Sequence, residues 1–479
     1  MREQTIDVVI IGAGTAGLNA RREVEKAGKS WVIVEGGPYG TTCARVGCMP
    51  SKLLIAAADA AWEAQHAGTF GVDVPEVRID GRAVLARVTS ERDRFAGFVV
   101  AATEAIPEAN RVRGYARFED PHTLVVDDHT RLHAGAVVVA TGSSPWVPPP
   151  LDTLGDRVLV NDDVFEWDDL PPSVAVFGTG IIGLELGQAL HRLGVRVTFF
   201  NPFDELGPFS DPAVADEARA VLGSELDLQL GVSVDGVEPH GPHGVRVAWT
   251  DSDGVARDAV YDRVLAAAGR RANLARLDLE HAGIELDDRG RPTVDPHTGQ
   301  AGDTHVFFAG DVSGFRPLLH EASDEGRIAG FNAARFPDVA SEERRVPLAV
   351  AFTDPQMAIV GPRFADLDPA TTAFGEVSYA DQGRARVIGR NQGLVRIYAD
   401  TETCRLVGAE MFGPRVEHTA HLLAWAVGLG VTVNAALKLP FYHPVLEEGL
   451  RTALRDLAAK LRTTRRCSPC EMATAPPGT

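Results

Sequence analysis

The chain has 479 residues, a formal net charge of −19 at pH 7 and a hydrophobic content of 45%. This length predicts roughly two to four domains with large buried cores, and the negative charge argues against binding to nucleic acid or to an anionic membrane surface. A membrane-spanning helix needs about 18 consecutive apolar residues, and no run in the sequence is that long. The short, acidic segment before the first apolar run does not resemble a signal peptide, so we expect a cytoplasmic protein.

The first feature along the chain is a β-α-β unit. Residues 7–11 predict a strand buried on both faces, residues 18–27 a helix, and residues 31–34 a second strand that is followed by Glu35. In a dinucleotide-binding unit, glycines permit the tight turn, the approach of a pyrophosphate to the helix N-terminus and close helix–strand packing, while the acid binds a ribose. The glycines of this turn are Gly12, Gly14 and Gly17.

The same pattern returns in the middle of the chain. Strands predicted over residues 174–177 and 195–200 flank a helix that ends near Leu193. Asn201 follows the first glycine of this unit at the offset at which Glu35 follows Gly12. One such fingerprint can be a glycine turn of another α/β unit, but two with matched offsets predict two dinucleotide-binding domains. The glycines of the second turn are Gly178, Gly180 and Gly183.

Two of the five cysteines, Cys43 and Cys48, lie just after the first of these units. Their spacing allows one helical turn to bring the two sulfurs together as a disulfide that a nearby dinucleotide could reduce. In a cytoplasmic protein a close cysteine pair is more often catalytic or metal-binding than structural, and the scattered histidines offer no metal site. The alternative is a pair of buried thiols without a redox role, which is a minor possibility beside a nucleotide unit.

The remaining segments complete the expected fold. Residues 136–142 and 304–311 each predict a buried strand followed by a loop, and the proline-rich run 145–150 indicates a domain boundary. Beyond residue 345, strands predicted over residues 349–353, 357–360, 393–398 and 406–411 precede helices predicted over 416–428 and 446–461, which is typical of a mixed α+β domain. The expected fold class is α/β, with two Rossmann-like domains and a C-terminal α+β domain. The expected boundaries are 1–150 and 271–345 for the first domain, 151–270 for the second, 346–465 for the third and 466–479 for a tail.

The order of these motifs resembles that of the flavoprotein disulfide reductases, the class I pyridine nucleotide-disulfide oxidoreductases, and most of all the dihydrolipoamide dehydrogenases. The likeness covers nearly the whole chain. It includes Cys-x4-Cys followed by Met-Pro-Ser-Lys, the two nucleotide units, Ala-Thr-Gly, Ala-Gly-Asp, Phe-Thr-Asp-Pro and a late His-Pro with a following Glu. This resemblance implies a homodimer, with FAD-binding, nicotinamide-binding and dimerisation domains.

The resemblance also assigns the cofactor-binding residues. Lys52 would lie near the flavin and pair with Glu185, just beyond the second glycine turn. Lys52 could otherwise be a surface lysine, and Asp311 could be a helix cap as well as a flavin ligand. The FAD-binding residues implied are Gly12, Gly14, Gly17, Glu35, Thr42, Lys52, Thr141, Gly142, Gly310 and Asp311. Those implied for the nicotinamide dinucleotide are Gly178, Gly180, Gly183, Asn201 and Gly269.

The catalytic residues implied by the family are Cys43, Cys48, Lys52, Glu185, His443 and Glu448. Cys48 would be the sulfur nearer the flavin, and Cys43 the exposed thiol that exchanges with the substrate, which requires a thiolate. His443 would be the base and Glu448 its orienting partner, acting on the disulfide of the other subunit. A lone histidine is more often a surface or helix-cap residue, but the Tyr-His-Pro context and Glu448 favour the catalytic interpretation.

Two positions depart from the family pattern. Thr41 stands where a glycine is usual, and its β-branched side chain restricts the backbone. Asn201 stands where a carboxylate favours NAD over NADP. Residues 202–205 contain two acids and no arginine, so we expect NAD, with NADP not excluded.

The C-terminal tail carries a second cysteine pair, Cys467 and Cys470. Relatives that reduce large or metal-bound substrates have a redox pair at a similar distance from the base. The tail is either a relay that takes electrons from Cys43 and Cys48 of the other subunit, or a tail whose Cys-x-x-Cys is incidental or binds stray metal.

These expectations define a leading function and its alternatives. The leading one is an FAD-dependent oxidoreductase that connects a nicotinamide cofactor to a dithiol, with dihydrolipoamide as the default. The alternatives are reduction of another disulfide or of mercuric ion through the tail, and a non-catalytic subunit that retains the fold. The complete catalytic set argues against the last. A transhydrogenase fits poorly, because it needs neither both cysteines nor the base.

Overall fold

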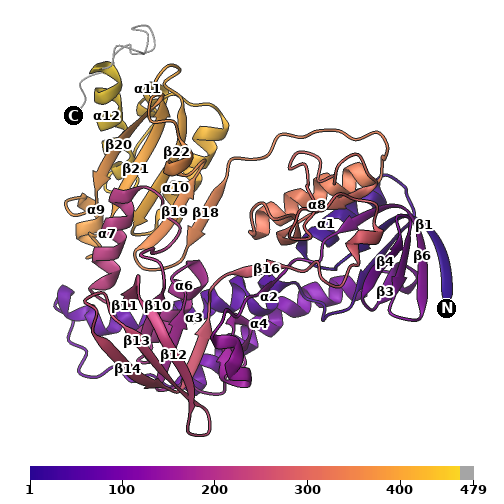
Figure 1. Cartoon of the computed structure of the whole chain (residues 1–479). Coiled ribbons are helices and arrows are strands. Elements are labelled where there is room, and N and C mark those ends of the chain that lie inside the picture. Colours follow the sequence, from indigo (N-terminus) through magenta and orange to yellow (C-terminus); the bar gives the residue numbers. More distant parts are fainter. Residues whose placement is uncertain (464–479) are drawn as a thin grey trace.

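The computed structural model describes residues 1–463 and is built around three β-sheets (Figure 1). The first has the strand order β3-β2-β1-β6-β5-β4, and β17 pairs with β6 outside that path. The pairs β1–β2, β2–β3, β1–β6 and β6–β17 are parallel. The strands are β1 (Arg2–Ile11), β2 (Trp31–Glu35), β3 (Arg111–Arg113), β4 (Ala116–Asp120), β5 (Thr123–Val126), β6 (Thr130–Val139) and β17 (Val306–Phe308).

Strand β1 begins five residues earlier than expected, because it pairs with β6 from Arg2 onward. Its last four residues are buried, as predicted for the centre of a parallel sheet. Helices α1 (Thr15–Lys26) and α8 (Leu319–Ala333) pack closely beside this sheet. A Cβ on Gly326 of α8 would lie 2.2 Å from the carbonyl oxygen of Ala16, so only glycine permits this approach.

The second sheet is parallel, in the order β11-β10-β9-β15-β8. Its strands are β8 (Val158–Leu159), β9 (Ser173–Phe177), β10 (Arg196–Asn201), β11 (Asp227–Leu230) and β15 (Arg263–Ala266). A three-stranded meander absent from the sequence prediction follows β11, with strands β12 (Ser233–His240), β13 (Gly244–Thr250) and β14 (Ala256–Tyr261). The helices here are α5 (Asn161–Val164), α6 (Ile181–Arg192) and α7 (Pro212–Gly223), and β7 (Ser143–Pro145) pairs with β16 (Arg270–Ala272).

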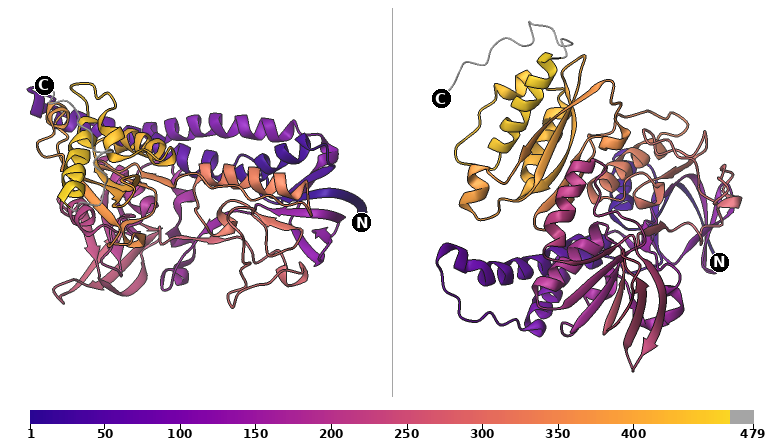
Figure 2. Two further views of the ribbon diagram at one scale, coloured as in Figure 1. Left: turned by 90° about the horizontal axis from the view of Figure 1, so that it is seen from above. Right: turned by 60° about the vertical axis from the view of Figure 1, so that its left-hand side comes forward.

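Two long helices connect the first two units (Figures 1 and 2). Helix α3 (Cys48–His66) and helix α4 (Gly81–Glu104) follow the short helix α2 (Thr42–Val46). Leu54 of α3 and Leu85 of α4 share one hydrophobic core with Leu184 and Leu190 of α6. Apolar packing therefore fixes α3, with Cys48 at its first position, against the second unit.

The third unit is an antiparallel sheet in the order β18-β19-β22-β21-β20, covered by helices. Four of the strands lie where the sequence predicts strands, but β20 was not predicted. Helix α12 packs against β20 so closely that a Cβ on Gly375 would lie 2.1 Å from the carbonyl oxygen of Ala453. The elements are β18 (Leu348–Ala351), β19 (Gln356–Val360), β20 (Thr372–Ser378), β21 (Leu394–Asp400), β22 (Leu406–Gly413), α9 (Gly383–Val387), α10 (Val416–Gly428), α11 (Val433–Leu437) and α12 (Glu448–Thr463).

Among residues 1–463, no helix has the length and apolar character needed to cross a bilayer. Cys467 and Cys470 lie outside the described residues, so the prediction of a redox tail stays a prediction.

Candidate active site

The first glycine turn forms a space for a pyrophosphate. A Cβ on Gly12 (φ +109°) would lie 2.3 Å from the carbonyl oxygen of Ala140, and a Cβ on Gly17 would lie 1.9 Å from that of Gly12. At Gly14, the N-cap of α1, a Cβ would meet no atom within 4 Å. The two outer glycines are thus required by packing, while the middle one borders open space at a helix N-terminus, where an anion is favoured.

The second glycine turn repeats this geometry. A Cβ on Gly178 (φ +116°) would lie 2.4 Å from the carbonyl oxygen of Ala267, and a Cβ on Gly183 would lie 2.1 Å from that of Gly178. Gly180, the N-cap of α6, again borders open space. Gly269 has φ +110° and no atom within 4 Å of its Cβ position. The residues present therefore fit two dinucleotides, one at each turn.

The second strand of each β-α-β unit ends in a polar residue, Glu35 in β2 and Asn201 in β10, and these two residues have different hydrogen-bond partners. Glu35 accepts hydrogen bonds from the N–H groups of Ala13, at 2.8 Å, and Gly37, at 2.7 Å. Asn201 instead donates to Thr179 Oγ1 at 2.6 Å and to the carbonyl oxygen of Glu205 at 3.0 Å. The Asn201 amide therefore stabilises its own loop, and its role in ribose binding stays a prediction.

Cys43 and Cys48 lie on two helices rather than on one helical turn. Cys43 belongs to α2, which ends at Val46. Gly47 separates the two helices, and Cys48 is the first residue of α3. Both cysteines are free thiols here, Cys43 half-buried and Cys48 exposed. This differs from the expectation that Cys43 is the exposed thiol. The break occurs because Gly47 adopts a non-helical conformation (φ −124°, ψ −117°) and a Cβ there would approach the backbone of Thr42.

The two thiols have opposite ionisation tendencies. The Cys43 S–H donates to Cys48, and this hydrogen bond is the main reason why the pKa of Cys48 falls to about 6. Burial opposes that shift, whereas the charge of Lys52 assists it. The same hydrogen bond and burial raise the pKa of Cys43. Cys48 is therefore the thiolate of the pair, and its place at the N-terminus of α3 also favours a negative charge.

Thr41 has a backbone conformation that favours glycine. Its φ of 60° and ψ of 150° lie in a region that only glycine occupies without strain. The side chain compensates in part, because Thr41 Oγ1 accepts the N–H of Ala44 at 3.4 Å and so caps α2. Thr42 is exposed at the first position of that helix. The strained residue thus lies directly before the segment that carries Cys43.

Lys52 and Glu185 form the ion pair that the sequence predicts. Lys52 Nζ donates to Glu185 Oε2 at 2.6 Å, and Glu185 is 5% exposed. Lys52 lies one helical turn after Cys48, on the same face of α3. The structure therefore brings Cys43, Cys48, Lys52 and Glu185 together from α2, α3 and α6.

The Ala-Thr-Gly and Ala-Gly-Asp segments lie on adjacent strands, because β6 and β17 pair. Asp311 Oδ2 accepts the hydroxyl of Ser143 at 2.6 Å. Thr141 Oγ1 donates to the carbonyl oxygen of Asn273 at 2.8 Å. Gly142 accepts the N–H of Asn273 at 2.9 Å and has φ +67°.

Sequence reasoning missed three supporting residues in this region. Arg270 donates to the hydroxyl and the carbonyl of Ser143 at 2.8 and 2.7 Å. Asn273 binds Thr141 through both side chain and backbone. The buried Glu325 accepts the N–H of Gly310 at 2.8 Å. The only sequence signal for Asn273 and Arg270 is their closeness to Gly269, and nothing local marks Glu325.

His443 and Glu448 form the predicted pair in the third unit. His443 Nδ1 lies 3.1 Å from each carboxylate oxygen of Glu448, and Glu448 Oε2 also accepts the N–H of Val445 at 3.2 Å. Although burial acts in the opposite direction, these hydrogen bonds lower the pKa of Glu448. The His443 side chain is 81% exposed. Glu448 is therefore an anion that orients an accessible imidazole.

Within one chain the His443–Glu448 pair stands apart from the cysteines, since α12 and α2 belong to separate parts of the molecule (Figure 1). No hydrogen bond or ion pair joins the two groups among residues 1–463. The third unit also exposes an apolar face on α10 and its C-cap: Leu422, Trp425 and the C-cap residue Leu429 are 46%, 69% and 81% exposed and recur at helical spacing.

Two protein-family models match the chain. The model described as pyridine nucleotide-disulphide oxidoreductase matches residues 6–326, and the model of that family's dimerisation domain matches residues 347–454. A dihydrolipoyl dehydrogenase of Haloferax volcanii is 32% identical over 462 residues, which cover 94% of this chain and 96% of that protein. A soluble pyridine nucleotide transhydrogenase of Mycobacterium bovis is 28% identical over 474 residues, which cover 96% and 98%.

Solved structures share the fold over nearly the whole chain. LpdA from Mycobacterium tuberculosis has a TM-score of 0.80 at 25% identity, covering 95% of this chain and 99% of that one. The HOCl-induced flavoprotein disulfide reductase RclA from Escherichia coli has a TM-score of 0.76 at 22% identity, covering 94% and 99%. The expected fold class, with two Rossmann-like domains and a C-terminal dimerisation domain, is confirmed.

Proposed function

Because the chain belongs to the pyridine nucleotide-disulphide oxidoreductases, we propose that it passes electrons between NAD and a dithiol or disulfide substrate by way of FAD and the Cys43–Cys48 pair. Dihydrolipoamide, free or on a lipoyl-bearing protein, is the proposed dithiol. The observation that carries this proposal is the pair formed by Cys43 of α2 and Cys48 at the start of α3, in which Cys43 and Lys52 both stabilise a Cys48 thiolate. FAD and a pyridine nucleotide are the cofactors of this enzyme class.

The two glycine turns divide the cofactors between them. Residues 1–150 and 271–345 would form the FAD-binding domain, with Gly14 at the pyrophosphate and Asp311 and Lys52 toward the flavin. Residues 151–270 would bind NAD at Gly180, and residues 346–465 would form the dimer interface. Bound flavin supplies the two-electron step between nicotinamide and sulfur, and the protein provides orientation and charge.

The cysteines would carry out the exchange with substrate. In the reducing direction, His443 of the partner subunit would take the proton of the Cys43 S–H as the Cys43 sulfur attacks one sulfur of a substrate disulfide. The departing substrate thiolate would then take that proton from His443. The Cys48 thiolate then attacks the Cys43 sulfur, which re-forms the intramolecular disulfide and releases the second substrate thiol. Oxidation of dihydrolipoamide runs through the same bonds in reverse, with His443 as the base.

The arrangement supports a homodimer. Residues 347–454 match the dimerisation domain, and the exposed apolar face of α10 has the character of a protein interface. The His443–Glu448 pair lies apart from the cysteines of its own chain. We propose that each active site combines Cys43 and Cys48 of one subunit with His443 and Glu448 of the other.

Two alternative activities compete with the oxidation of dihydrolipoamide. Another disulfide or mercuric ion would use the tail cysteines, which lie outside the described residues. Hydride exchange between nicotinamides is suggested by the Mycobacterium bovis relative, but it leaves the Cys48 thiolate and the His443–Glu448 pair without a task. Dihydrolipoamide stays the leading proposal, because the Haloferax volcanii relative is a dihydrolipoyl dehydrogenase.

Anaerobic titration of the purified protein tests the proposal. Addition of NADH should produce a long-wavelength absorption band from a thiolate beside oxidised flavin, with a weaker response to NADPH. Activity should then be compared with lipoamide, glutathione disulfide, thioredoxin and mercuric ion. A preparation that binds no FAD, or a flavin that is reduced without any thiols appearing, would overturn the proposed function.

A further inference from the structure

One face of α6 carries three buried polar side chains, Glu185, Gln188 and Arg192. Their spacing of three and four residues places them on the same face of the helix. Because buried polar groups destabilise a fold unless they are hydrogen-bonded, the partners of these three side chains show what the face does.

All three side chains bind residues 352–354, which connect β18 to β19. Glu185 Oε1 accepts the N–H of Phe352 at 2.8 Å. Gln188 accepts the N–H of Asp354 and donates to its carbonyl oxygen, each at 2.8 Å. Arg192 donates to the carboxylate of Asp354 at 2.8 Å and to its carbonyl oxygen at 3.1 Å. One helix face thus fixes both backbone and side chain of a segment from the third unit.

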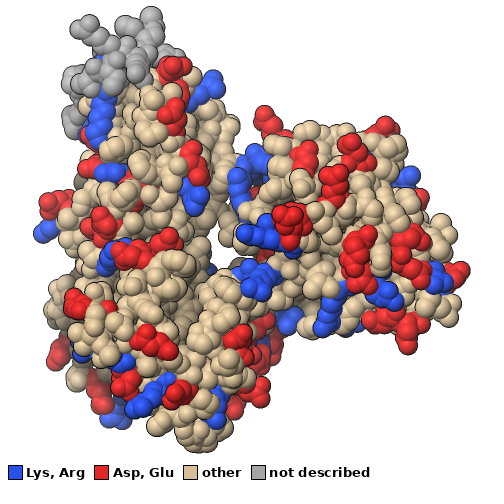
Figure 3. Space-filling view, in the orientation of Figure 1, with Lys and Arg blue, Asp and Glu red and all other residues tan. Residues whose placement is uncertain are grey.

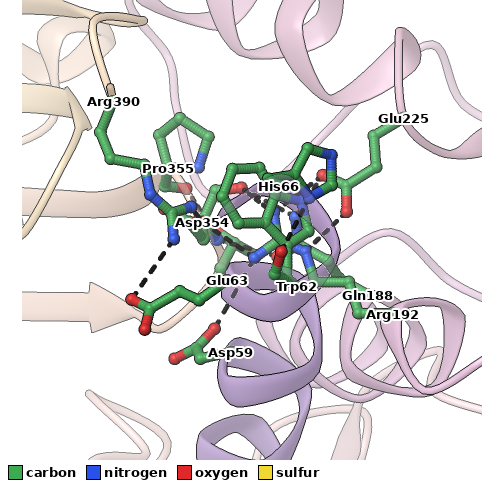
Figure 4. A network of polar contacts seen from close by, with 11 residues as sticks. Asp59, Trp62, Glu63, His66, Gln188, Arg192, Glu225, Asp354, Pro355 and Arg390 are labelled. Carbon is green, nitrogen blue, oxygen red and sulfur yellow. Dashed lines mark hydrogen bonds and ion pairs between the residues drawn. The ribbon is translucent and has the colours of Figure 1, made fainter. Parts of the chain in front are cut away.

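Figure 4 shows that the same contacts reach the C-terminal half of α3. The guanidinium of Arg192 lies 5.0 Å from the ring centre of Trp62, and that of Arg390 lies 3.7 Å from it. Arg390 also pairs with Asp354. Arg192 in addition forms a two-pronged contact with Glu225, at 2.6 and 3.0 Å. Helix α3 is therefore tied to residues 352–354 near the end opposite to Cys48.

The start of α3 is tied to the same segment through Lys52. The Lys52 ammonium donates to Ser51 Oγ within α3 at 3.3 Å, and its two other neighbours lie in or depend on residues 352–354. Its hydrogen-bond partner Glu185 is oriented by the N–H of Phe352, and the Phe352 ring centre lies 4.7 Å from Lys52 Nζ. The position of the Lys52 charge therefore follows the position of this segment.

We propose that Gln188, Arg192 and Asp354 are positioning residues that hold Lys52 in the place where it stabilises the Cys48 thiolate. We call these three residues the α6 clamp. Through the α6 clamp, a segment of the dimerisation domain sets the reactivity of a thiol in the first unit. The inference rests on the proposed function, in that Cys48 is taken to be the redox thiolate.

The groups that face Cys48 explain the expected direction. They are Cys43 on α2, Lys52 on α3 and Glu185 on α6. Cys43 and Lys52 lower the pKa of Cys48, while burial and the negative charge of Glu185 raise it. If Phe352 no longer orients Glu185, both Glu185 and Lys52 lose their fixed places. The favourable effect of Lys52 is the larger of the two, so more is lost on the favourable side, whereas burial remains. Loss of the α6 clamp therefore raises the pKa of Cys48.

The test measures the alkylation rate of Cys48 by iodoacetamide against pH, read on the Cys48 peptide by mass spectrometry. The reference is the reduced holoenzyme carrying Cys43→Ala, in which Lys52 is the remaining side chain that lowers the pKa of Cys48. Gln188→Met removes both hydrogen bonds to Asp354 at similar volume, and Asp354→Asn removes the carboxylate but keeps its backbone contacts. Asp366→Asn is the control, since it breaks an exposed pair with Arg363 in the same unit.

We expect Gln188→Met and Asp354→Asn to move the midpoint upward by about half a unit to one unit, so that alkylation below the midpoint slows about three- to tenfold. Asp366→Asn should leave the midpoint unchanged. In a Lys52→Met background, Gln188→Met should cause no further shift, because the clamp acts through Lys52. A merely structural role would lower the melting temperature and leave the midpoint in place.

Several outcomes overturn the inference. These are an unchanged midpoint in both clamp variants, an equal shift in the Lys52→Met background, or no effect of Lys52→Met itself. If Gln188→Met does not fold, Asp354→Asn decides. The NADH titration tests the proposed function separately. If the wild-type protein forms the thiolate band but both clamp variants keep the alkylation midpoint of the reference protein, the clamp alone is refuted.

Discussion

Lys52 Nζ and Glu185 Oε2 lie 2.6 Å apart, although the two residues belong to helices of different units. This ion pair fixes a positive charge one helical turn from Cys48, where α3 begins. The ion pair joins α6 of the second nucleotide-binding unit to α3, the helix that begins with Cys48.

The first prediction concerns the ionisation of Cys48. In the reduced protein, alkylation of Cys48 should follow a pKa of about 6, and Cys43→Ala should move it upward because the S–H donor is lost. Since folding lowers this pKa from 9.0, the stabilisation is fully present above pH 9.0 and is lost as pH falls through about 6. Denaturation measured across this range should show that loss in wild-type protein and less of it in Cys43→Ala.

The second prediction concerns the strain at Thr41. Thr41→Gly should raise the free energy of unfolding by about 1 kcal/mol, because relief of the left-handed conformation outweighs the lost cap and the added freedom of the unfolded chain. Thr42→Gly, at the exposed first position of α2, is the matched control and should be neutral or destabilising. Denaturant unfolding measures both, and a destabilised Thr41→Gly variant would contradict the strain argument.

The third prediction separates the two nucleotide sites. Gly14→Ala should weaken FAD binding by about tenfold or more while the apoprotein keeps its stability, because the added Cβ meets no protein atom but fills the space beside a phosphate. Gly180→Ala should raise the KM for NADH and leave FAD bound. Gly17→Ala should destabilise the apoprotein itself, since its Cβ would lie 1.9 Å from a carbonyl oxygen. Flavin retention and thermal unfolding distinguish these cases.

The sequence predicted the parts of the site whose conformation demands a particular residue. Gly12 and Gly178 are recognisable because a positive φ and a close carbonyl leave no choice. The α6 clamp was not predictable, since Gln188 and Asp354 are ordinary residues far apart in the chain and only the packing of three units brings them together. The helix break at Gly47 was missed for a related reason, because a single glycine can be tolerated within a helix.

The fourth prediction tests the shared active site. Cys43→Ala and His443→Ala homodimers should each lose disulfide reduction. A heterodimer of the two variants should recover about half of the wild-type rate, because one of its two sites then holds an intact Cys43 and an intact His443. If base and thiol acted within one chain, each subunit would carry one defect and the heterodimer would stay inactive.

Electrons from the nicotinamide are expected to reach the Cys43–Cys48 pair, and counting the free thiols after anaerobic addition of NADH measures this transfer. Oxidised protein is treated with NADH, quenched with a labelled alkylating agent and analysed by peptide mass spectrometry. We expect NADH to make Cys43 and Cys48 reactive toward the label together, and Lys52→Met to reduce the labelling of Cys48 near pH 6. Reduction of the flavin while both cysteines stay unlabelled would contradict this expectation.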